Sequence, residues 1–264
     1  MIVDSLTTNL SKIIVDSKVK ALRNYYEQAV DVANYTNQDT FRCLKLQKGI
    51  STAFVRVFRS TGNGYPDINA IANIYNAAKE GLGVEIYIEP QPCSTKSGNE
   101  QFMETYNFLK TNDIVIRSIW IKITLPIIWP NNQDYNIQFI NQFITSAQQY
   151  ALIIGIYTNW YDWQQITAGW SKWSSSTQQL SIRLWYWNML GSDWYAATTT
   201  SFDDFRSFGG FNEPLVKQYV QNVHICQIYT SLSIYINKIS MKALAANLRF
   251  QMANITVGNL GFYQ

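Results

Sequence analysis

The sequence has few of the residues on which many catalytic and metal sites depend. His224 is the only histidine among 264 residues, so a His-rich metal site is excluded and a Ser-His-Asp triad would depend on that single side chain. Cys43, Cys93 and Cys226 lie far apart without a CxxC pair, which argues against zinc sites and thioredoxin-type redox sites. We therefore interpret His224 as structural and expect no metal or other cofactor.

Charged residues are also scarce, at 15% of the chain with a net charge of +3. No Lys/Arg cluster of the kind that binds a phosphate backbone is present, so a nucleic-acid partner is not expected. No apolar run approaches the ~20 residues needed to span a bilayer, so no membrane span is predicted. The 47% hydrophobic content is enough to bury a full core.

Signals for the cellular compartment conflict. The first thirty residues lack the continuous apolar region of a signal peptide. Glycosylation sequons nevertheless begin at Asn9, Asn34 and Asn254, and these matter only in a secretory compartment. The residues alone leave the compartment open.

β-rich runs alternate with helical periodicity from about residue 29, which predicts βα units around a parallel sheet. The predicted strands span 29–35, 53–60, 83–92 and 151–159, with a further strand running into a loop over 116–130. Beyond residue 180, the runs 181–188 and 215–220 are strand-like but no amphipathic helix separates them. The predicted fold class is therefore α/β, a modified TIM-like barrel of five βα units followed by three strands with few helices.

Three segments are predicted along the chain. Residues 29–235 form the barrel domain, residues 1–28 an N-terminal helical appendage, and residues 236–264 a C-terminal extension. Either flank is a candidate to pack on the bottom of the barrel.

In a βα barrel the active site lies at the carboxyl ends of the strands. Asp31 ends the first predicted strand and Glu89 the third, and Lys122 and Thr124 follow Trp120 on one face of the fourth. The candidate substrate-binding residues at this end are Tyr87, Trp120, Tyr157, Asn159, Trp160 and Trp185. An aromatic rim with a few carboxylates and no Gly-rich phosphate loop favours a glycan ligand, although core packing also explains many aromatic residues.

Two further interpretations concern loops. Trp160, Trp163 and Trp170 are predicted to lie in a loop after the fifth strand. Asp203 and Asp204 are predicted to lie on an exposed surface turn near Arg206.

Four blocks carry a resemblance to a known family: AVDVANYTNQDTFRCLK, IGIYTNWYDWQQITAGW, LWYW and FDDFRSFGGFNEPLVKQY. They resemble the lysozyme-like proteins of nematodes and amoebae, related to glycoside hydrolase family 25. The resemblance implies a bacterial peptidoglycan substrate, a role in innate immune defence or digestion, and an extracellular or lysosome-related location. It also implies a disulfide between Cys43 and Cys226 if the compartment is oxidising, which would leave Cys93 unpaired.

The resemblance directs attention to the fourth strand. Catalytic relatives carry Trp-x-Asp-x-Glu there, with the Glu as proton donor, and alignment on Trp120 places Lys122 and Thr124 at the two acidic positions. A threonine hydroxyl is too weak an acid to protonate a glycosidic oxygen, and an ammonium opposes the positive charge of the transition state. Asp31 matches the family's first-strand aspartate, whereas Ser233 stands at the usual final-strand aspartate.

Alternatives therefore remain open. The first is a lysozyme-like glycosidase, a muramidase, with an altered constellation built on Asp31 and with Glu89 as the candidate acid. The second is a catalytically inactive pseudoenzyme that binds peptidoglycan or a related carbohydrate. Glu89 would act as an acid only in a partly apolar pocket, and a solvated residue at the start of a loop is the simpler interpretation. An unrelated reaction on the barrel, with Lys122 as a Schiff-base nucleophile, has no other support at the site.

Overall fold

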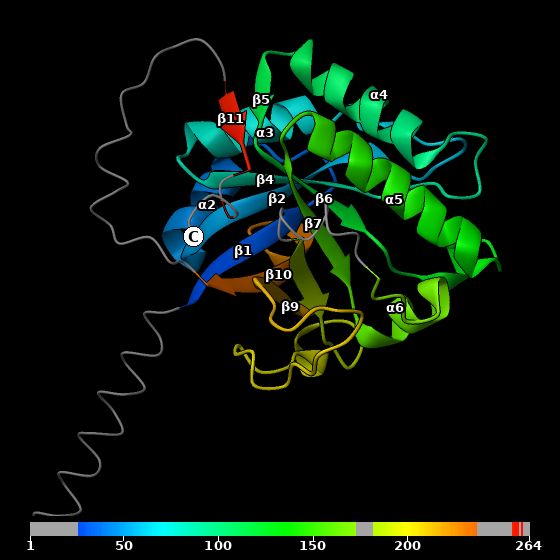
Figure 1. Ribbon diagram of the computed structural model, residues 1–264. Helices are drawn as coiled ribbons and strands as arrows, with labels where there is room; N and C mark the ends of the chain where they lie inside the picture. Colours follow the sequence, from blue (N-terminus) through cyan, green and yellow to red (C-terminus); the bar gives the residue numbers. More distant parts are fainter. Residues whose placement is uncertain (1–25, 173–181, 237–254, 259, 261–264) are drawn as a thin grey trace, which may run out of the picture.

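The computed structural model describes residues 26–172, 182–236, 255–258 and 260 (Figure 1). The helix predicted in the N-terminal appendage and most of the C-terminal extension lie outside these residues. The elements are β1 (Tyr26–Val32), α2 (Gln38–Lys48), β2 (Ile50–Arg59), β3 (Tyr65–Pro66), α3 (Ala70–Lys79), β4 (Gly83–Ile88), α4 (Gly98–Lys110), β5 (Ile114–Ile116), β6 (Ser118–Lys122), a 3-10 turn (Pro126–Ile128), α5 (Gln133–Gln149), β7 (Ile153–Thr158), α6 (Trp160–Thr167), β8 (Arg183–Trp187), a second 3-10 turn (Trp194–Ala196), β9 (Val216–Ile225), β10 (Ile228–Ile236) and β11 (Ile255–Val257).

The described strands form a closed eight-stranded barrel, as the sequence predicts. Their order is β1-β10-β9-β8-β7-β6-β4-β2, and parallel pairing of β1 with β2 closes the ring. The strands β1, β2, β4, β6 and β7 are each followed by a helix, whereas β8, β9 and β10 complete the barrel without one. Only β10 runs against its neighbours, since β8 and β9 are parallel. In Figure 1 α4 and α5 lie side by side along one flank, and the yellow segment after β8 covers another part of the barrel.

One loop prediction is wrong. Trp160 and Trp163 belong to the helix α6, because the side chain of Asn159 accepts a hydrogen bond from the backbone N–H of Asp162 and so caps the helix. Trp163 is buried against the outside of the sheet and Trp170 packs partly on the same core. Because aromatic residues dominate this run, the sequence pattern did not indicate that Asn159 caps a helix.

The barrel interior is filled by buried side chains. The buried cluster inside it consists of Ala29, Phe54, Tyr87, Trp120, Tyr157, Trp185, Val216 and Tyr235. Trp120 needs a glycine beside it, since a Cβ on Gly155 of β7 would lie 1.9 Å from its ring. The larger hydrophobic core lies between the sheet and the helices.

The connection from β8 to β9 replaces the missing helices with a polar anchor. Lys217 of β9 is fully buried, and its Nζ lies 2.6 Å from Asp204 Oδ2 and 2.7 Å from the Thr199 carbonyl oxygen. The hydroxyl of Tyr186 also donates to Asp204, at 2.5 Å. The expectation that Asp204 is a solvated surface acid is therefore wrong, because its carboxylate fixes this connection to the barrel.

Two long-range links complete the fold. A disulfide joins Cys43 of α2 to Cys226 in the β9–β10 turn, and Cys93 is a free, exposed cysteine. In the C-terminal extension, β11 pairs with β5, and the backbone N–H of Leu260 donates to the buried carboxylate of Glu85 at 2.8 Å. Across the described part of the chain, no helix combines the length and hydrophobicity of a membrane span.

Candidate functional site

The site lies at the mouth of the barrel, where the carboxyl ends of the parallel strands meet. Asp31 reaches this end from β1 and Lys122 from β6, and Lys122 Nζ lies 2.8 Å from Asp31 Oδ2. The hydroxyl of Tyr87, from β4, donates to the other carboxylate oxygen of Asp31 at 2.6 Å. The side chains of Lys122 and Asp31 are only 12% and 9% exposed, so water screens this pair weakly.

Asp31 and Lys122 end a line of alternating charges that we call the charge row, formed by Asp67, Arg56, Glu89, Lys122 and Asp31. Arg56 Nε lies 2.8 Å from Asp67 Oδ2, and Arg56 Nη1 lies 2.9 Å from Glu89 Oε2. Lys122 Nζ is 3.9 Å from Glu89 Oε1, which connects the two halves. Burial alone would lower the pKa of Arg56, but Glu89 and Asp67 outweigh it and raise that pKa. The row therefore holds each of its charges beside an opposite one.

Aromatic rings surround the ammonium of Lys122. Its Nζ lies 4.0 Å from the ring centroid of Tyr87, 4.9 Å from that of Tyr157 and 5.6 Å from that of Trp185. Burial and the nearby Asp31 carboxylate raise the pKa values of both tyrosine hydroxyls well above their ordinary range. The tyrosines therefore stay neutral, and their faces attract the cation.

A second carboxyl lies beside Thr124. The Thr124 hydroxyl donates to Asp162 of α6, which is only 3% exposed. Burial raises the pKa of Asp162, although the hydrogen bonds from Thr124 and from the backbone of Leu125 oppose the shift. The Thr124 hydroxyl is therefore engaged in linking the loop after β6 to the helix α6.

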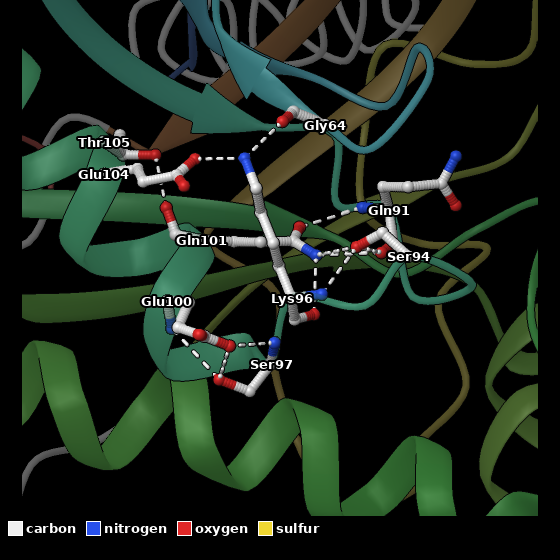
Figure 2. Close-up of polar contacts among 9 residues, drawn as sticks. All are labelled: Gly64, Gln91, Ser94, Lys96, Ser97, Glu100, Gln101, Glu104 and Thr105. Atoms are coloured by element: carbon white, nitrogen blue, oxygen red, sulfur yellow. Dashed lines mark hydrogen bonds and ion pairs between the residues drawn. The ribbon is translucent and has the colours of Figure 1, made fainter.

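The loop that carries Glu89 is held in place by hydrogen bonds from the helix α4. Figure 2 shows the side chain of Gln101, in α4, pointing into this loop. Its amide accepts from the Gln91 backbone N–H at 2.9 Å and donates to the Gln91 carbonyl at 2.8 Å and to the Lys96 carbonyl at 3.2 Å. Lys96 in turn links Glu104 and the carbonyl of Gly64, each at 2.8 Å. The loop that carries Glu89, the central member of the charge row, is therefore fixed in place.

The candidate substrate-binding residues lie at different depths. Trp120 and Trp185 are 2% and 0% exposed, so they form the packed floor beneath the mouth. Tyr87 and Tyr157 lie above them and contact Lys122. Trp160 is 62% exposed at the start of α6 and is free to meet a ligand, whereas the Asn159 side chain is engaged as the helix cap.

Sequence reasoning did not select Arg56 or Asp67 as site residues. A usable signal existed for Arg56, because it alternates with Val55 and Val57 near the carboxyl end of a predicted strand and so had to face inward. Asp67 gave no such signal, because it lies after the short hairpin strand β3.

Comparison with known proteins agrees with this architecture. The fold resembles that of a bacterial lysozyme from Streptomyces coelicolor, with a TM-score of 0.58 at 17% identity, covering 83% of this chain and 95% of that one. The pneumococcal autolysin LytC, solved in complex with a synthetic peptidoglycan ligand, gives a TM-score of 0.55 at 12% identity over 80% of this chain and 46% of that one. A family 25 glycosyl hydrolase from Bacillus anthracis gives a TM-score of 0.56 at 14% identity, covering 84% of this chain and 94% of that one, so the molecule has the barrel fold of the family 25 glycoside hydrolases.

The sequence comparisons identify the family. Residues 22–219 match the family model described as lysozyme-like protein 1. The chain is 43% identical over 226 residues to lysozyme-like protein 2 of Caenorhabditis elegans, covering 86% of this chain and 78% of the relative. It is 29% identical over 208 residues to a probable GH family 25 lysozyme 2 of Dictyostelium discoideum, covering 78% and 89%. This chain belongs to the lysozyme-like family.

Proposed function

We propose that this chain binds bacterial peptidoglycan and does not hydrolyse it. The observation that carries the proposal is the contact between Lys122 and Asp31, at 2.8 Å in the charge row. A glycosidase needs a carboxyl group that gives a proton to the leaving oxygen and usually a second carboxylate that stabilises the positive charge at the sugar. Here an ammonium occupies the place beside the surviving aspartate.

The charge row also argues against Glu89 as a replacement acid. Glu89 lies 2.9 Å from the guanidinium of Arg56 and 3.9 Å from the ammonium of Lys122. Each carboxylate oxygen of Glu89 therefore faces a cation of the charge row, so the side chain is engaged in ion pairs within the site. Asp31 and Glu89 therefore serve as structural anions at the mouth.

Glycan binding is supported by exposed aromatic residues that follow the strand ends at the mouth. Trp160, Tyr161 and Tyr35 are 62%, 56% and 59% exposed and follow the carboxyl ends of β7 and β1. Planar rings in such positions stack on the apolar faces of sugars. The family relationship and the peptidoglycan ligand of the structurally similar autolysin indicate which glycan to test.

The proposal is tested by two assays on one preparation of insoluble peptidoglycan. We expect saturable sedimentation of the protein with the polymer and no release of reducing ends, with an active family 25 lysozyme as the positive control. Release of reducing ends that is abolished by Asp31→Asn would overturn the non-hydrolytic assignment. Absence of both binding and release would overturn the glycan assignment itself.

Trp160 and Leu46 provide a matched pair of variants for the binding assay. Trp160→Ala removes an exposed ring at the mouth, and we expect about 2–10-fold weaker binding because such an aromatic contact contributes roughly 0.5–1.5 kcal/mol. Leu46 is 73% exposed on α2, and Leu46→Ala should leave binding unchanged. Equal behaviour of the two variants would contradict the placement of the ligand.

We further propose a role in innate defence or digestion, outside the cell or in a lysosome-related compartment. The family relationship supports this placement, as does the disulfide between Cys43 and Cys226, because such bonds persist in oxidising compartments. Detection of the reduced pair in protein isolated from its native tissue would count against it.

A further inference from the structure

Asn34 lies in a sequon that neither the charge row nor the proposed ligand explains. The sequon is Asn34-Tyr35-Thr36, in the loop between β1 and α2. Asn34 is exposed, and no hydrogen bond from its side-chain amide to another described residue is present; its backbone carbonyl instead accepts from Thr36 Oγ1 at 3.1 Å and from Asn73 Nδ2 at 2.9 Å. The backbone is thus fixed, while the amide nitrogen, which is the atom that carries an N-linked glycan, donates to none of the described residues.

We propose that Asn34 is a site of N-linked glycosylation and that its glycan stands at the mouth of the barrel. The disulfide between Cys43 and Cys226 supports the necessary compartment independently of the sequon. In the reaction, the amide nitrogen of Asn34 forms a bond to C1 of a lipid-linked oligosaccharide. The bond from C1 to the lipid diphosphate breaks, and the lipid diphosphate and a proton are released.

The fold dictates when this reaction takes place. Thr36, whose hydroxyl completes the sequon, is only 3% exposed, with its N–H bound to Asn73 Oδ1 at 2.8 Å and its carbonyl bound to Asn76 Nδ2 at 2.9 Å. A transferase that must reach this hydroxyl cannot do so once the loop has docked on α3. The glycan is therefore added before the barrel closes.

Chain topology leaves time for early modification. The strand β1 pairs with β10, with Asp31 opposite Ser231, so the barrel closes only when about 200 further residues have been made. At about 5–20 residues per second, synthesis of that length takes about 10–40 s. The barrel therefore closes well after the sequon is translated, and the contacts that cover Thr36 require α3, whose Asn73 and Asn76 lie 37 and 40 residues downstream.

The position of Asn34 ties the modification to the site. Asn34 follows Asp31 by three residues, and the carbonyl of the intervening Ala33 accepts from Arg56 Nη2, in the charge row, at 3.4 Å. A glycan on this loop stands beside the entrance and restricts the approach of a large polymer more than that of a short oligosaccharide. This last consequence, unlike the modification itself, rests on the proposed function.

The modification is tested on the full chain, secreted from insect cells behind an added signal sequence. Peptide mapping should find a glycan on Asn34 in the wild type and in Thr36→Ser, which keeps the sequon, and none there in Asn34→Gln. Peptide N-glycosidase should convert the modified Asn34 to aspartate. Unmodified Asn34 in secreted wild-type protein with an intact Cys43–Cys226 disulfide would overturn the proposal, whatever the result of the peptidoglycan assays.

The order of events has its own test. Unglycosylated chain produced in bacteria is offered to microsomes that contain the transferase and its lipid-linked donor, either folded and oxidised or unfolded and reduced. We expect modification of Asn34 only in the unfolded sample. Equal modification of the folded sample would refute the requirement that glycosylation precede barrel closure.

Discussion

Removal of Lys122 tests whether its contact with Asp31 is a structural ion pair. Lys122→Met keeps most of the side-chain length but leaves Asp31, 9% exposed, without the ammonium at 2.8 Å. Loss of one partner of a buried pair costs about 3–5 kcal/mol. The Tyr87 hydroxyl still donates to Asp31, so we expect a loss near the lower end, about 3 kcal/mol.

The double variant Asp31→Asn/Lys122→Met removes both charges together. Because neither partner is then left uncompensated, we expect a total loss of only about 0–2 kcal/mol, less than either single variant. Because the double variant loses less than Asp31→Asn alone, the double-mutant cycle should yield a coupling energy above about 3 kcal/mol, measured by urea unfolding at pH 7 and low salt. Asp39→Asn, in a pair whose aspartate is 86% exposed, should cost less than about 1 kcal/mol and serves as the control. Additive losses at Asp31 and Lys122 would refute the assignment of a structural pair.

Three further predictions concern the same end of the molecule and its covalent link. The double change Lys122→Asp with Thr124→Glu should produce measurable release of reducing ends from peptidoglycan. The new carboxyl group at position 124 would lie beside Asp162, and a neighbouring negative charge favours the protonated form that an acid catalyst needs. A folded double variant that releases no reducing ends would show that more than these two side chains is missing. Replacing Cys43 and Cys226 by serine should lower the free energy of unfolding by about 5 kcal/mol for their separation of 183 residues, as measured by urea unfolding, and an unchanged midpoint would contradict this. Burial raises the pKa of Asp162 in the folded state, so the folded protein holds the Asp162 proton more tightly than the unfolded chain does. The contribution of Asp162 to the free energy of unfolding therefore falls as pH rises above about 4, and Asp162→Asn should remove this part of the pH dependence. Parallel pH profiles of stability for the wild type and the variant would contradict this prediction.

The sequence predicts the barrel well because hydrophobic alternation and helical periodicity report directly on burial. The run around Trp120 alternates as a strand, and the structure gives it as β6 between β4 and β7. The same alternation indicates which face a residue occupies but not its depth along the barrel. Trp120 and Trp185 therefore looked like rim residues although both are buried beneath the mouth.

Interactions between distant residues were harder to predict. Lys217 and Asp204 are an ion pair across a loop, and only the fold shows that the lysine is fully buried. The charge row likewise joins residues from β1, β2, β6 and two loops, and its members are far apart in the sequence. Local patterns describe single elements, so such a constellation requires the coordinates of all of them.

The interlocking of the charge row also constrains how this mouth can change during evolution. Asp31 and Glu89 both lie within 3.9 Å of the Lys122 ammonium. Replacing Lys122 alone by an acidic residue would therefore place three carboxylates together. Such an intermediate would be less stable than either its ancestor or its descendant. Evolution from this protein toward one with an unpaired acidic residue at position 122 thus requires paired or compensating mutations. Neutral substitutions at single positions will tend to preserve the charge row.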